Sequence, residues 1–491
     1  MKINRNLISA VILILLAVSA CQQAAPLPAP TNLPPAATTA APSSPTAAPT
    51  ALPAPTQPPT AAASAAAPSG VRTCDFVPGK SSPVVIPPTT PVVEASPTPM
   101  TFKTGDTSSL DRELTVFNQL VKEINDNYYA SDFNGVDWTA IQAEYKALIQ
   151  KGLALADFYQ AMSQMVGELN DEGASSYHGP AVSPSPTPSN TNYVGIGGSF
   201  ATVSDAGKDV YVLNWVYPGS PAEQAGLKSH DLLLKVDGGP FMDDKGMPRA
   251  LGAAGSTVVV TVQTPGQAPR DVKIVRAKIS ATQLVDSCLV AGTSIGYLRL
   301  VDISNIATLY QMLAALKKMS AGSPLQGIIL DLRQVGGGNF NLSNLSASLG
   351  LFTSGSLGSF VNPRTSGTLQ LFSATANTDD TSGAQKLPLV VLQDQNTFPA
   401  ALSSGLLQLN GRARIVGQTA IGAFYWLWCD DTSDGSQLCV PSGVFQPEGK
   451  SPDYWKKTGV VPDVPVDGRW DQYTEATDPY LAKALELLTK K

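Results

Sequence analysis

The chain has 491 residues, of which 43% are hydrophobic and 15% are charged, and its formal net charge is −6 at pH 7. That length is enough for two or three globular domains. The acidic balance, together with the lack of a long run of Lys and Arg, argues against a nucleic-acid partner.

The first twenty residues are typical of an export signal. Lys2 and Arg5 precede an apolar run that starts at Leu7 and is too short to cross a bilayer comfortably. The run ends in Val-Ser-Ala-Cys, which resembles a bacterial lipobox, whose Cys thiol receives the lipid. We therefore predict a lipoprotein signal peptide over residues 1–20 and lipidation of Cys21; the alternative is an ordinary secretory signal with an incidental Cys. The lipid would hold the protein outside the cytoplasm, on the bacterial cell membrane or envelope.

Residues 21–100 are dominated by Ala, Pro, Thr and Ser and carry almost no charge. Such a composition cannot bury a hydrophobic core, and its prolines favour extended, polyproline-like conformations. We therefore expect a disordered stalk that holds the folded part of the chain away from a membrane or wall.

Four cysteines remain after the predicted lipidation site, and an even number favours disulfides in an exported protein. Four cysteines allow three pairings. Cys429 and Cys439 flank a polar, turn-rich stretch, which favours a local bridge between them, and Cys74 would then pair with Cys288. The alternative is four free thiols. With only two His and no metal-ligand spacing, we expect neither a metal site nor a cofactor.

Between Leu110 and Leu169, apolar residues recur at steps of three and four positions. This periodicity is typical of amphipathic helices. We predict a small helical domain over residues 101–190.

The next segment carries the strongest pattern in the chain. Residues 193–198 read Tyr-Val-Gly-Ile-Gly-Gly and begin an alternating strand, and residues 217–238 spell a turn, a short helix capped by Gly226 and a strand that ends in Asp-Gly. This order of positions resembles a PDZ domain of the bacterial protease type, which we predict over residues 191–280.

A PDZ domain binds a chain end by adding it as a strand to an exposed sheet edge. The resemblance implies a peptide-binding site at Val194, Gly195, Ile196 and Gly197, where glycines permit close approach and backbone N–H groups receive the terminal carboxylate. His230 stands at a turn where the family often has Gly, and we expect it to be exposed.

Residues 281–491 alternate apolar strands with helical stretches. Four of their segments are informative: an Ile-Ile-Leu-Asp-Leu-Arg strand before glycines (327–338), a Leu-Val-Val-Leu strand before a helix (389–402), a Gly-Arg-Ala turn before a strand (411–417) and Gly-Val-Val-Pro-Asp-Val (459–464). They resemble the tail-specific, or carboxyl-terminal processing, proteases, which are serine peptidases with a PDZ domain. The resemblance extends from about residue 108 to residue 480.

The family resemblance implies a multidomain α+β fold, with a small N-terminal helical domain, a PDZ domain and an α/β C-terminal domain (281–491) of the ββα-type found in tail-specific proteases. It also implies that Gly337 and Gly338 are the remnant of the turn whose backbone N–H groups help to form the oxyanion hole. The alternative is a glycine-rich loop with no ligand.

The residues that should carry the chemistry are missing. Alignment on the Gly-Arg-Ala turn puts the Ser nucleophile of the family at Phe398, and alignment on Thr-Phe-Pro-Ala-Ala puts it at Pro399. The Lys base falls on Ala423. Ser403 and Ser404 lie deeper in the same predicted helix, where a serine is usually solvated or bonded to the backbone. We therefore assign no catalytic residue.

The favoured interpretation is an extracytoplasmic, lipid-anchored pseudoprotease that binds peptides or the C-terminal tails of exported proteins through its PDZ domain. The first alternative is an active serine endopeptidase that acts on envelope or exported proteins with a non-standard nucleophile. The second is a structural envelope protein whose PDZ groove is unused.

Overall fold

The computed structural model describes residues 71–76, 109–171, 174–180, 192–205, 208–244, 246–280, 282–303, 305–335, 341–398, 400–452 and 454–490. All of them belong to one compact unit, Ala63–Lys491. The predicted signal peptide with Cys21, most of the predicted stalk, Pro399 and the glycines Gly337 and Gly338 lie outside the described residues. Within the described ranges, no helix is long and apolar enough to cross a membrane.

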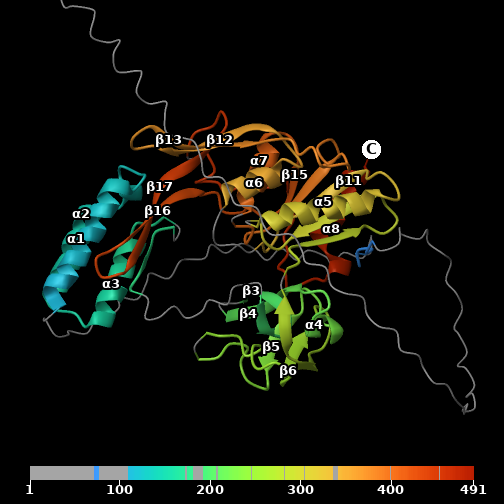
Figure 1. Ribbon diagram of the computed structural model, residues 1–491, viewed down its shortest axis with the longest axis horizontal. Coiled ribbons are helices and arrows are strands. Elements are labelled where there is room, and N and C mark those ends of the chain that lie inside the picture. Colours follow the sequence, from blue (N-terminus) through green and yellow to red (C-terminus); the bar gives the residue numbers. More distant parts are fainter. Residues whose placement is uncertain are drawn as a thin grey trace, which may run out of the picture. The chain divides into compact units, whose positions relative to one another are not determined.

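The N-terminal region is helical, as predicted. It contains α1 (Leu110–Asn127), the short 3-10 helix η2 (Phe133–Gly135), α2 (Trp138–Gln150) and α3 (Leu155–Gly167). Asp137 caps α2 by accepting a hydrogen bond of 3.0 Å from the Ala140 N–H. The apolar stripes of these helices form one core together with strand β17 (Gln437–Pro447), which lies beside them in Figure 1. The helical region therefore completes its core with a strand from near the other end of the chain.

The PDZ domain is built on an antiparallel sheet in the order β3-β4-β5-β6-β7. Its strands are β3 (Gly198–Asp205), β4 (Lys208–Val216), β5 (Leu232–Val236), β6 (Thr257–Gln263) and β7 (Arg270–Val275). A separate pair joins β2 (Asn192–Gly195) to β8 (Ala277–Ser280). The short helix α4 (Pro221–Gln224) is capped by Ser220, whose side chain accepts a hydrogen bond from the Glu223 N–H. Strand β3 stands at the edge of the sheet.

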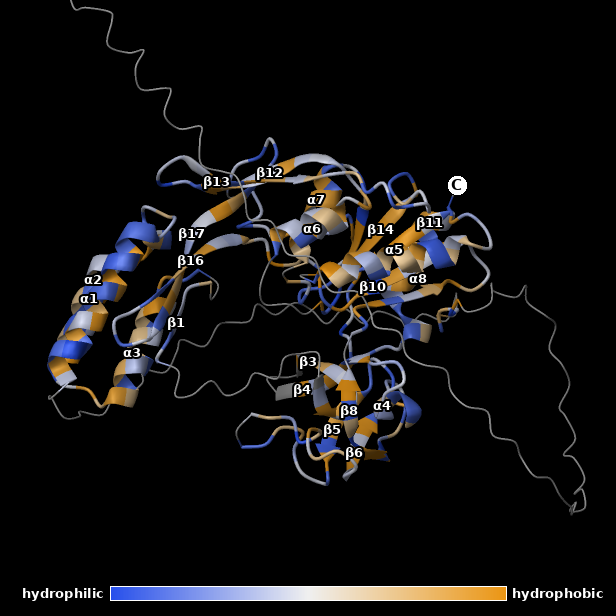
Figure 2. Ribbon diagram, viewed as in Figure 1, coloured by the Kyte–Doolittle hydropathy of each residue, from blue (hydrophilic) through white to orange (hydrophobic). Residues whose placement is uncertain are grey.

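The C-terminal domain contains a six-stranded sheet in the order β18-β15-β14-β11-β10-β9. Its strands are β9 (Val285–Leu289), β10 (Ile295–Leu300), β11 (Gly327–Asp331), β14 (Leu389–Gln393), β15 (Arg414–Gly417) and β18 (Val464–Pro465). All pairs are parallel except β9 with β10. The central strands are mostly apolar, as Figure 2 shows for β11 and β14, because both faces of the sheet are covered; the polar Asp331 and Gln393 stand at the ends of these two strands.

Helices cover the two faces of this sheet. They are α5 (Ile306–Ser320), α6 (Leu342–Leu349), α7 (Ala401–Leu409) and α8 (Pro479–Thr489). Side chains alternate along a strand, so Ile328 packs in the core with α5, α6 and α7, whereas Ile329 packs in the core with α8. The short 3-10 helix η3 (Glu475–Thr477) precedes α8. The α+β architecture predicted from the sequence is therefore confirmed.

A second sheet, in the order β1-β17-β12-β13, carries β16 as an extra strand paired with β17. Its remaining strands are β1 (Ser176–His178), β12 (Gly355–Asn362), β13 (Gly367–Ala374) and β16 (Tyr425–Asp431). Disulfides join Cys429 to Cys439 across the β16–β17 hairpin and Cys74 to Cys288 on β9, with Cα–Cα distances of 4.1 and 5.2 Å. These are the two pairs that the cysteine spacing favours.

Candidate functional site

The loop between β2 and β3 has the properties of an anion-binding turn. Gly197 adopts a φ of +93°, and a Cβ on it would overlap Ser220, so only glycine fits. The carbonyls of Ile196 and Gly197 are turned toward the α4 region, where they accept hydrogen bonds from the Ala222 N–H at 2.7 Å and the Tyr217 N–H at 3.0 Å. No described residue accepts a hydrogen bond from the N–H of Ile196 or Gly197, although both residues are buried. These two donors can receive an anionic oxygen.

An apolar groove opens beside this loop and encloses about 530 Å³. Its apolar lining includes Ile196, Phe200, Leu213, Leu233, Phe241 and Leu251. The rings of Phe200 and Phe241 meet edge to face, with centroids 4.8 Å apart. The exposed edge strand β3 forms one wall, so the groove combines an open backbone edge, an apolar floor and two unpaired N–H groups. That combination fits an extended peptide with a terminal carboxylate.

The groove is not made by the PDZ domain alone. Residues that precede and begin α5, namely Val301, Asp302, Asn305 and Ala307, also line it. This contribution could not be predicted from the sequence, because these residues belong to the C-terminal domain and have no counterpart in the peptide-binding motif.

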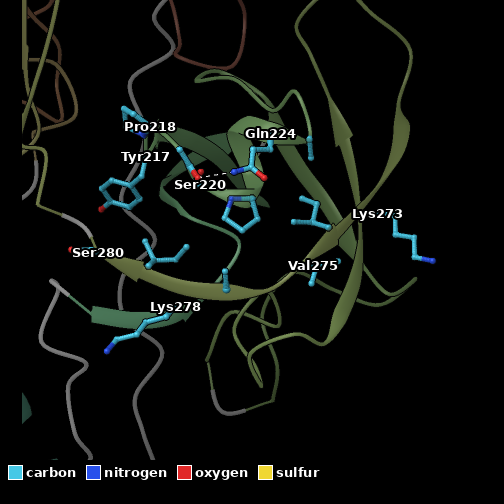
Figure 3. A pocket seen from close by; sticks show the side chains of 14 residues that line it. Tyr217, Pro218, Ser220, Gln224, Lys273, Val275, Lys278 and Ser280 are labelled. Atoms are coloured by element: carbon cyan, nitrogen blue, oxygen red, sulfur yellow. Dashed lines mark hydrogen bonds between the residues drawn. The ribbon is translucent and has the colours of Figure 1, made fainter. Parts of the chain in front are cut away.

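A second hollow of about 630 Å³ lies between α4 and strands β7 and β8 (Figure 3). The Gln224 side chain donates a hydrogen bond of 2.9 Å to the Gly219 carbonyl, which fixes the rim. The amines of Lys273 and Lys278 point away from the hollow in Figure 3. The lining of this hollow mixes apolar side chains, such as Ile274 and Ile279, with polar ones, and neither lysine offers its amine to a ligand inside it.

The position that aligns with the nucleophile is occupied by an exposed aromatic ring. Strand β14 ends at Gln393, α7 begins at Ala401, and Phe398 in the turn between them is 51% exposed. Asp394 holds this turn: its carboxylate accepts hydrogen bonds from the Thr397 hydroxyl at 2.9 Å and the Gln334 side-chain amide at 2.7 Å. Burial raises the pKa of Asp394 above its ordinary value.

The position that aligns with the base is buried rather than open. Ala423 is 3% exposed, and a Cβ on the preceding Gly422 would overlap the Trp455 backbone. The Trp455 ring also covers Gly405 of α7, where an added Cβ would lie 2.6 Å from the indole. Phe424 completes this packing, with its ring centroid 5.7 Å from that of Trp455. The surroundings of the base position are therefore hydrophobic core.

The two serines on α7 are structural. Ser404 is fully buried and donates to the side-chain oxygen of Gln393. Gln393 is fixed in turn by hydrogen bonds from its amide nitrogen to the carbonyls of Gln418 at 2.9 Å and Val460 at 2.8 Å. The Ser403 hydroxyl is also buried, and no partner for it exists in the described part of the chain.

No Lys, Arg or His side chain in the described part of the chain forms a hydrogen bond with either serine. Lys456 donates to the Tyr129 hydroxyl at 2.9 Å, and the Lys450 amine lies 5.0 Å from the centre of the Tyr454 ring. Further charged groups among the described residues at this end of the sheet are the Asp394 carboxylate and a buried ionic cluster around Arg333. A hydroxyl without an adjacent base is a weak nucleophile, so the geometry gives no support for a relocated catalytic serine.

The Asp-Leu-Arg motif at the end of β11 forms this ionic cluster. Arg333 is fully buried and binds Asp331 at 2.6 Å, Asp478 at 2.7 Å and the Tyr473 hydroxyl at 3.0 Å. Burial by itself would raise the pKa of Asp331, but the paired guanidinium lowers it below its ordinary value. The motif therefore fixes the C-terminal segment that leads into α8.

His230 is buried, and the expectation that it is exposed was wrong. It is 3% exposed, its ring stacks on Trp470 with centroids 3.9 Å apart, and its Nδ1 lies 2.8 Å from the Trp470 carbonyl oxygen. Burial lowers the pKa of His230 to about 3. The turn was recognisable from the sequence, but Trp470 lies 240 residues away, so nothing local indicated the contact.

The same junction holds strand β4 of the PDZ domain. The Asn214 side chain donates a hydrogen bond of 2.8 Å to the Gln334 carbonyl and accepts one from Arg299. The guanidinium of Arg299 lies 4.6 Å from the centre of the Trp470 ring. A continuous set of buried contacts therefore links the PDZ sheet to the turn held by Asp394.

Potential metal ligands gather in one place among the described residues. Atoms of Cys74, Cys288 and Glu475 lie within 4.8 Å of one another. The two sulfurs are bonded to each other, so this group does not offer a set of ligands for a metal.

Three family models match the chain in the order of its domains. The Tricorn protease C1 domain matches residues 114–167, the PDZ domain matches residues 212–264, and peptidase family S41 matches residues 294–466.

The chain is also similar to individual proteins of this kind. A carboxyl-terminal-processing protease of Synechocystis is 32% identical over 286 residues, which are 55% of this chain and 63% of that protein. A chloroplastic C-terminal processing peptidase of Tetradesmus obliquus is 27% identical over 379 residues, or 72% of this chain and 77% of that protein. The solved photosystem II D1 C-terminal processing protease is 26% identical with a TM-score of 0.49, and the match covers 72% of this chain and 93% of that one.

The order of the helical, PDZ and C-terminal segments, the spelling of the strand ends and these matches agree, and the chain belongs to the tail-specific, or carboxyl-terminal processing, protease family.

Proposed function

We propose that this protein is a non-hydrolytic member of its family that binds peptides, or the C-terminal tails of exported proteins, in the groove beside β3. One observation carries the proposal: the groove and its N–H donors are intact, whereas the nucleophile position holds the exposed Phe398 and the base position holds the buried Ala423. The other candidate nucleophile position is a proline in the sequence, so neither alignment supplies a hydroxyl.

Amide hydrolysis by this route requires a nucleophile, a base within hydrogen-bond reach and donors for the oxyanion. The Ser404 hydroxyl is occupied by Gln393, and in the described structure neither serine of α7 contacts an amine or an imidazole. Peptide binding requires none of these groups. It needs a strand edge, an apolar floor and donors for a carboxylate, all of which the groove has.

We further propose that the protein acts outside the cytoplasm, anchored by a lipid on Cys21. The charged and apolar pattern of residues 1–20 and the pairing of Cys74 with Cys288 support export to an oxidising compartment. Metabolic labelling with a palmitate analogue tests the anchor. Incorporation should disappear in Cys21→Ala, and unchanged incorporation would refute the lipid attachment.

The binding activity is tested by calorimetry on the purified protein with a synthetic peptide that ends in a large apolar residue and a free carboxylate. We expect measurable binding, and at least tenfold weaker binding of the same peptide with an amidated C-terminus. Leu251→Lys, which puts a charge on the groove lining, should weaken binding of the free-carboxylate peptide. Equal binding of the acid and the amide would contradict recognition of a chain end.

The alternative, an active endopeptidase, makes the opposite prediction. Wild-type protein should not react with a fluorophosphonate probe and should not cleave an unfolded substrate above background. Robust labelling, lost in Ser403→Ala or Ser404→Ala, would establish catalysis by a relocated nucleophile and overturn the proposal.

A further inference from the structure

Strand β16 is an edge strand with an unusually apolar surface. It pairs with β17 on one side, and no other described strand pairs with it. Trp426, Leu427 and Trp428 are 37%, 46% and 44% exposed. Proteins usually protect such edges with charges, prolines or bulges, because an open edge recruits other strands. Here the exposed edge presents large apolar side chains instead.

The two tryptophans lie on the same face of the strand. Side chains alternate along a strand, so Trp426 and Trp428 point to one face and Leu427 to the other. The Trp426 ring is supported from within the sheet by Phe360, with ring centroids 5.5 Å apart. The Trp426 end of this face therefore rests on a packed aromatic ring.

The backbone of β16 has hydrogen-bonding groups turned to the open side. Cys429 and Cys439 are opposite each other with Cα atoms 4.1 Å apart, a spacing typical of a non-hydrogen-bonded antiparallel pair. The N–H and C=O of Cys429 therefore point away from β17, and so do those of Leu427, two residues earlier. Leu427 faces Pro441, which has no N–H to donate, in agreement with this register.

The β16–β17 hairpin is held in one conformation before any partner binds. The disulfide joins its two strands, and its turn is closed by a hydrogen bond of 2.7 Å from the Thr432 N–H to the Ser436 carbonyl. The Asp434 carboxylate accepts further bonds from the Thr432 hydroxyl at 2.7 Å and the Ser436 N–H at 3.1 Å. A partner strand would therefore meet an edge that needs little ordering on binding.

The charged residues beside this edge indicate which partner segments would bind to it. Asp430 and Asp431 follow the apolar residues at the end of β16, both are exposed, and neither forms an ion pair with another described residue. A strand that runs antiparallel to β16 would place its first residues beside these carboxylates and its later residues beside the tryptophans. Charge complementarity therefore favours a basic residue followed by alternating apolar residues.

We propose that the open edge of β16 binds an extended segment of a partner protein by strand addition, with a Lys or Arg beside Asp430 and apolar side chains over Trp428 and Trp426. This site goes beyond the groove at β3, because it reads the interior of an extended segment and needs no chain end. The two sites can fail independently.

A blocked peptide serves as the probe: acetyl-Lys-Thr-Ile-Thr-Ile-Thr-amide, labelled with a fluorophore and followed by fluorescence anisotropy on the full-length protein. Its blocked ends remove the carboxylate that the β3 groove would require. We expect saturable binding, at least tenfold weaker in Trp428→Lys and several-fold weaker in Asp430→Asn. The same peptide with its first two threonines N-methylated should not bind, because these threonines lie opposite Cys429 and Leu427 and their N–H groups are the backbone donors of the added strand.

Matched variants distinguish strand addition from non-specific hydrophobic binding. Leu427→Pro removes the outward N–H and should abolish binding, whereas Leu427→Ala keeps it and should bind within about threefold of wild type. Leu371→Lys changes a 75% exposed leucine on β13 of the same sheet and should leave binding unchanged. Thermal unfolding of each variant shows that the fold is retained.

Three outcomes would overturn the proposal. Unchanged binding in both Trp428→Lys and Leu427→Pro would show that β16 is not the site. Binding lost in Leu251→Lys would assign the peptide to the groove at β3. A wild-type dimer in light scattering that dissociates in Leu427→Pro would assign the edge to a second copy of this chain.

Discussion

Phe398 and Ala423, the residues that we align with the nucleophile and the base of the family, differ in their surroundings. The Phe398 side chain is half exposed in a turn held by Asp394, whereas Ala423 lies in the core beside Trp455. The position that we align with the base is therefore filled by hydrophobic packing, which makes the two positions unequal targets for reconstruction.

Phe398→Ser should change the free energy of unfolding by no more than about 0.5 kcal/mol, because the ring is exposed. Ala423→Lys should destabilise the protein by at least about 2 kcal/mol, because an amine would enter a packed apolar site. The double variant should show little or no hydrolysis of an unfolded substrate. Urea unfolding and a fluorogenic assay measure the two effects, and a stable, active double variant would show that the packing beside Trp455 accommodates a lysine.

Ser404 and Ser403 provide a matched pair. Ser404→Ala should cost about 1–3 kcal/mol, because it leaves the buried side-chain oxygen of Gln393 without its donor. Ser403→Ala should be neutral or stabilising, because it removes a buried hydroxyl that has no partner among the described residues. Chemical denaturation of both variants checks this order. The reverse order would contradict the structural role assigned to Ser404.

At the scale of elements, the β16–β17 hairpin links three features of the molecule. Its β17 strand completes the core of the helical region, its β16 strand provides the open edge, and its disulfide fixes both. The segment before the helical region is fixed in a comparable way: the Cys74 N–H donates to the Leu289 carbonyl at 3.0 Å, and Arg72 pairs with Asp286 at 2.6 Å.

Non-reducing peptide mapping should recover Cys429 linked to Cys439 and Cys74 linked to Cys288. Replacing both cysteines of the hairpin by serine should cost about 2–4 kcal/mol, the usual contribution of a disulfide, and should weaken binding of the blocked peptide by making the β16 edge more mobile. A fragment that joins Cys74 to either cysteine of the hairpin would contradict both the structure and the loop argument.

At the scale of the whole molecule, the junction between the PDZ and C-terminal domains is polar but buried. His230, Asn214 and Arg299 meet Trp470 and the strand ends of the C-terminal domain. Such contacts are stable only when every charge is compensated, as the two carboxylates around Arg333 illustrate.

This junction predicts a pH dependence of stability. The pKa of His230 falls from 6.5 to about 3 on folding, so the unfolded chain binds a proton at this site that the folded chain does not bind between those values. The neutral, buried imidazole of His230 makes its full contribution to the free energy of unfolding above pH 6.5. As the pH falls from 6.5 toward 3, the free energy of unfolding decreases by at most about 1.4 kcal/mol per pH unit.

The test compares urea unfolding of wild type and His230→Asn at pH 7.0, 6.0 and 5.0. Asn tolerates the φ of +77° that His230 adopts. The variant should be less stable at pH 7, because the stacking on Trp470 is lost, but its stability should decline less steeply between pH 6.5 and pH 5. Parallel pH curves for the two proteins would show that His230 titrates normally in the folded state.

Much of this protein could be predicted from local sequence. Local residue patterns determined the elements and their order, because each element depends on neighbouring residues. Examples are the helical periodicity from Leu110 to Leu169, the PDZ turn at Gly226 and the apolar strands of the C-terminal domain. The sequence also shows directly that Ser and Lys are absent at the aligned positions, because this depends only on residue identity.

The tertiary structure alone decided which of these residues are buried and what they contact. It placed His230 against Trp470, closed hydrophobic core around Ala423, tied Ser404 to Gln393 and left β16 with an open edge. Burial and strand pairing depend on segments that are far apart in the sequence and meet only in the folded chain. For that reason the sequence could indicate the family and the residue types at the aligned positions, but not the contacts that surround them.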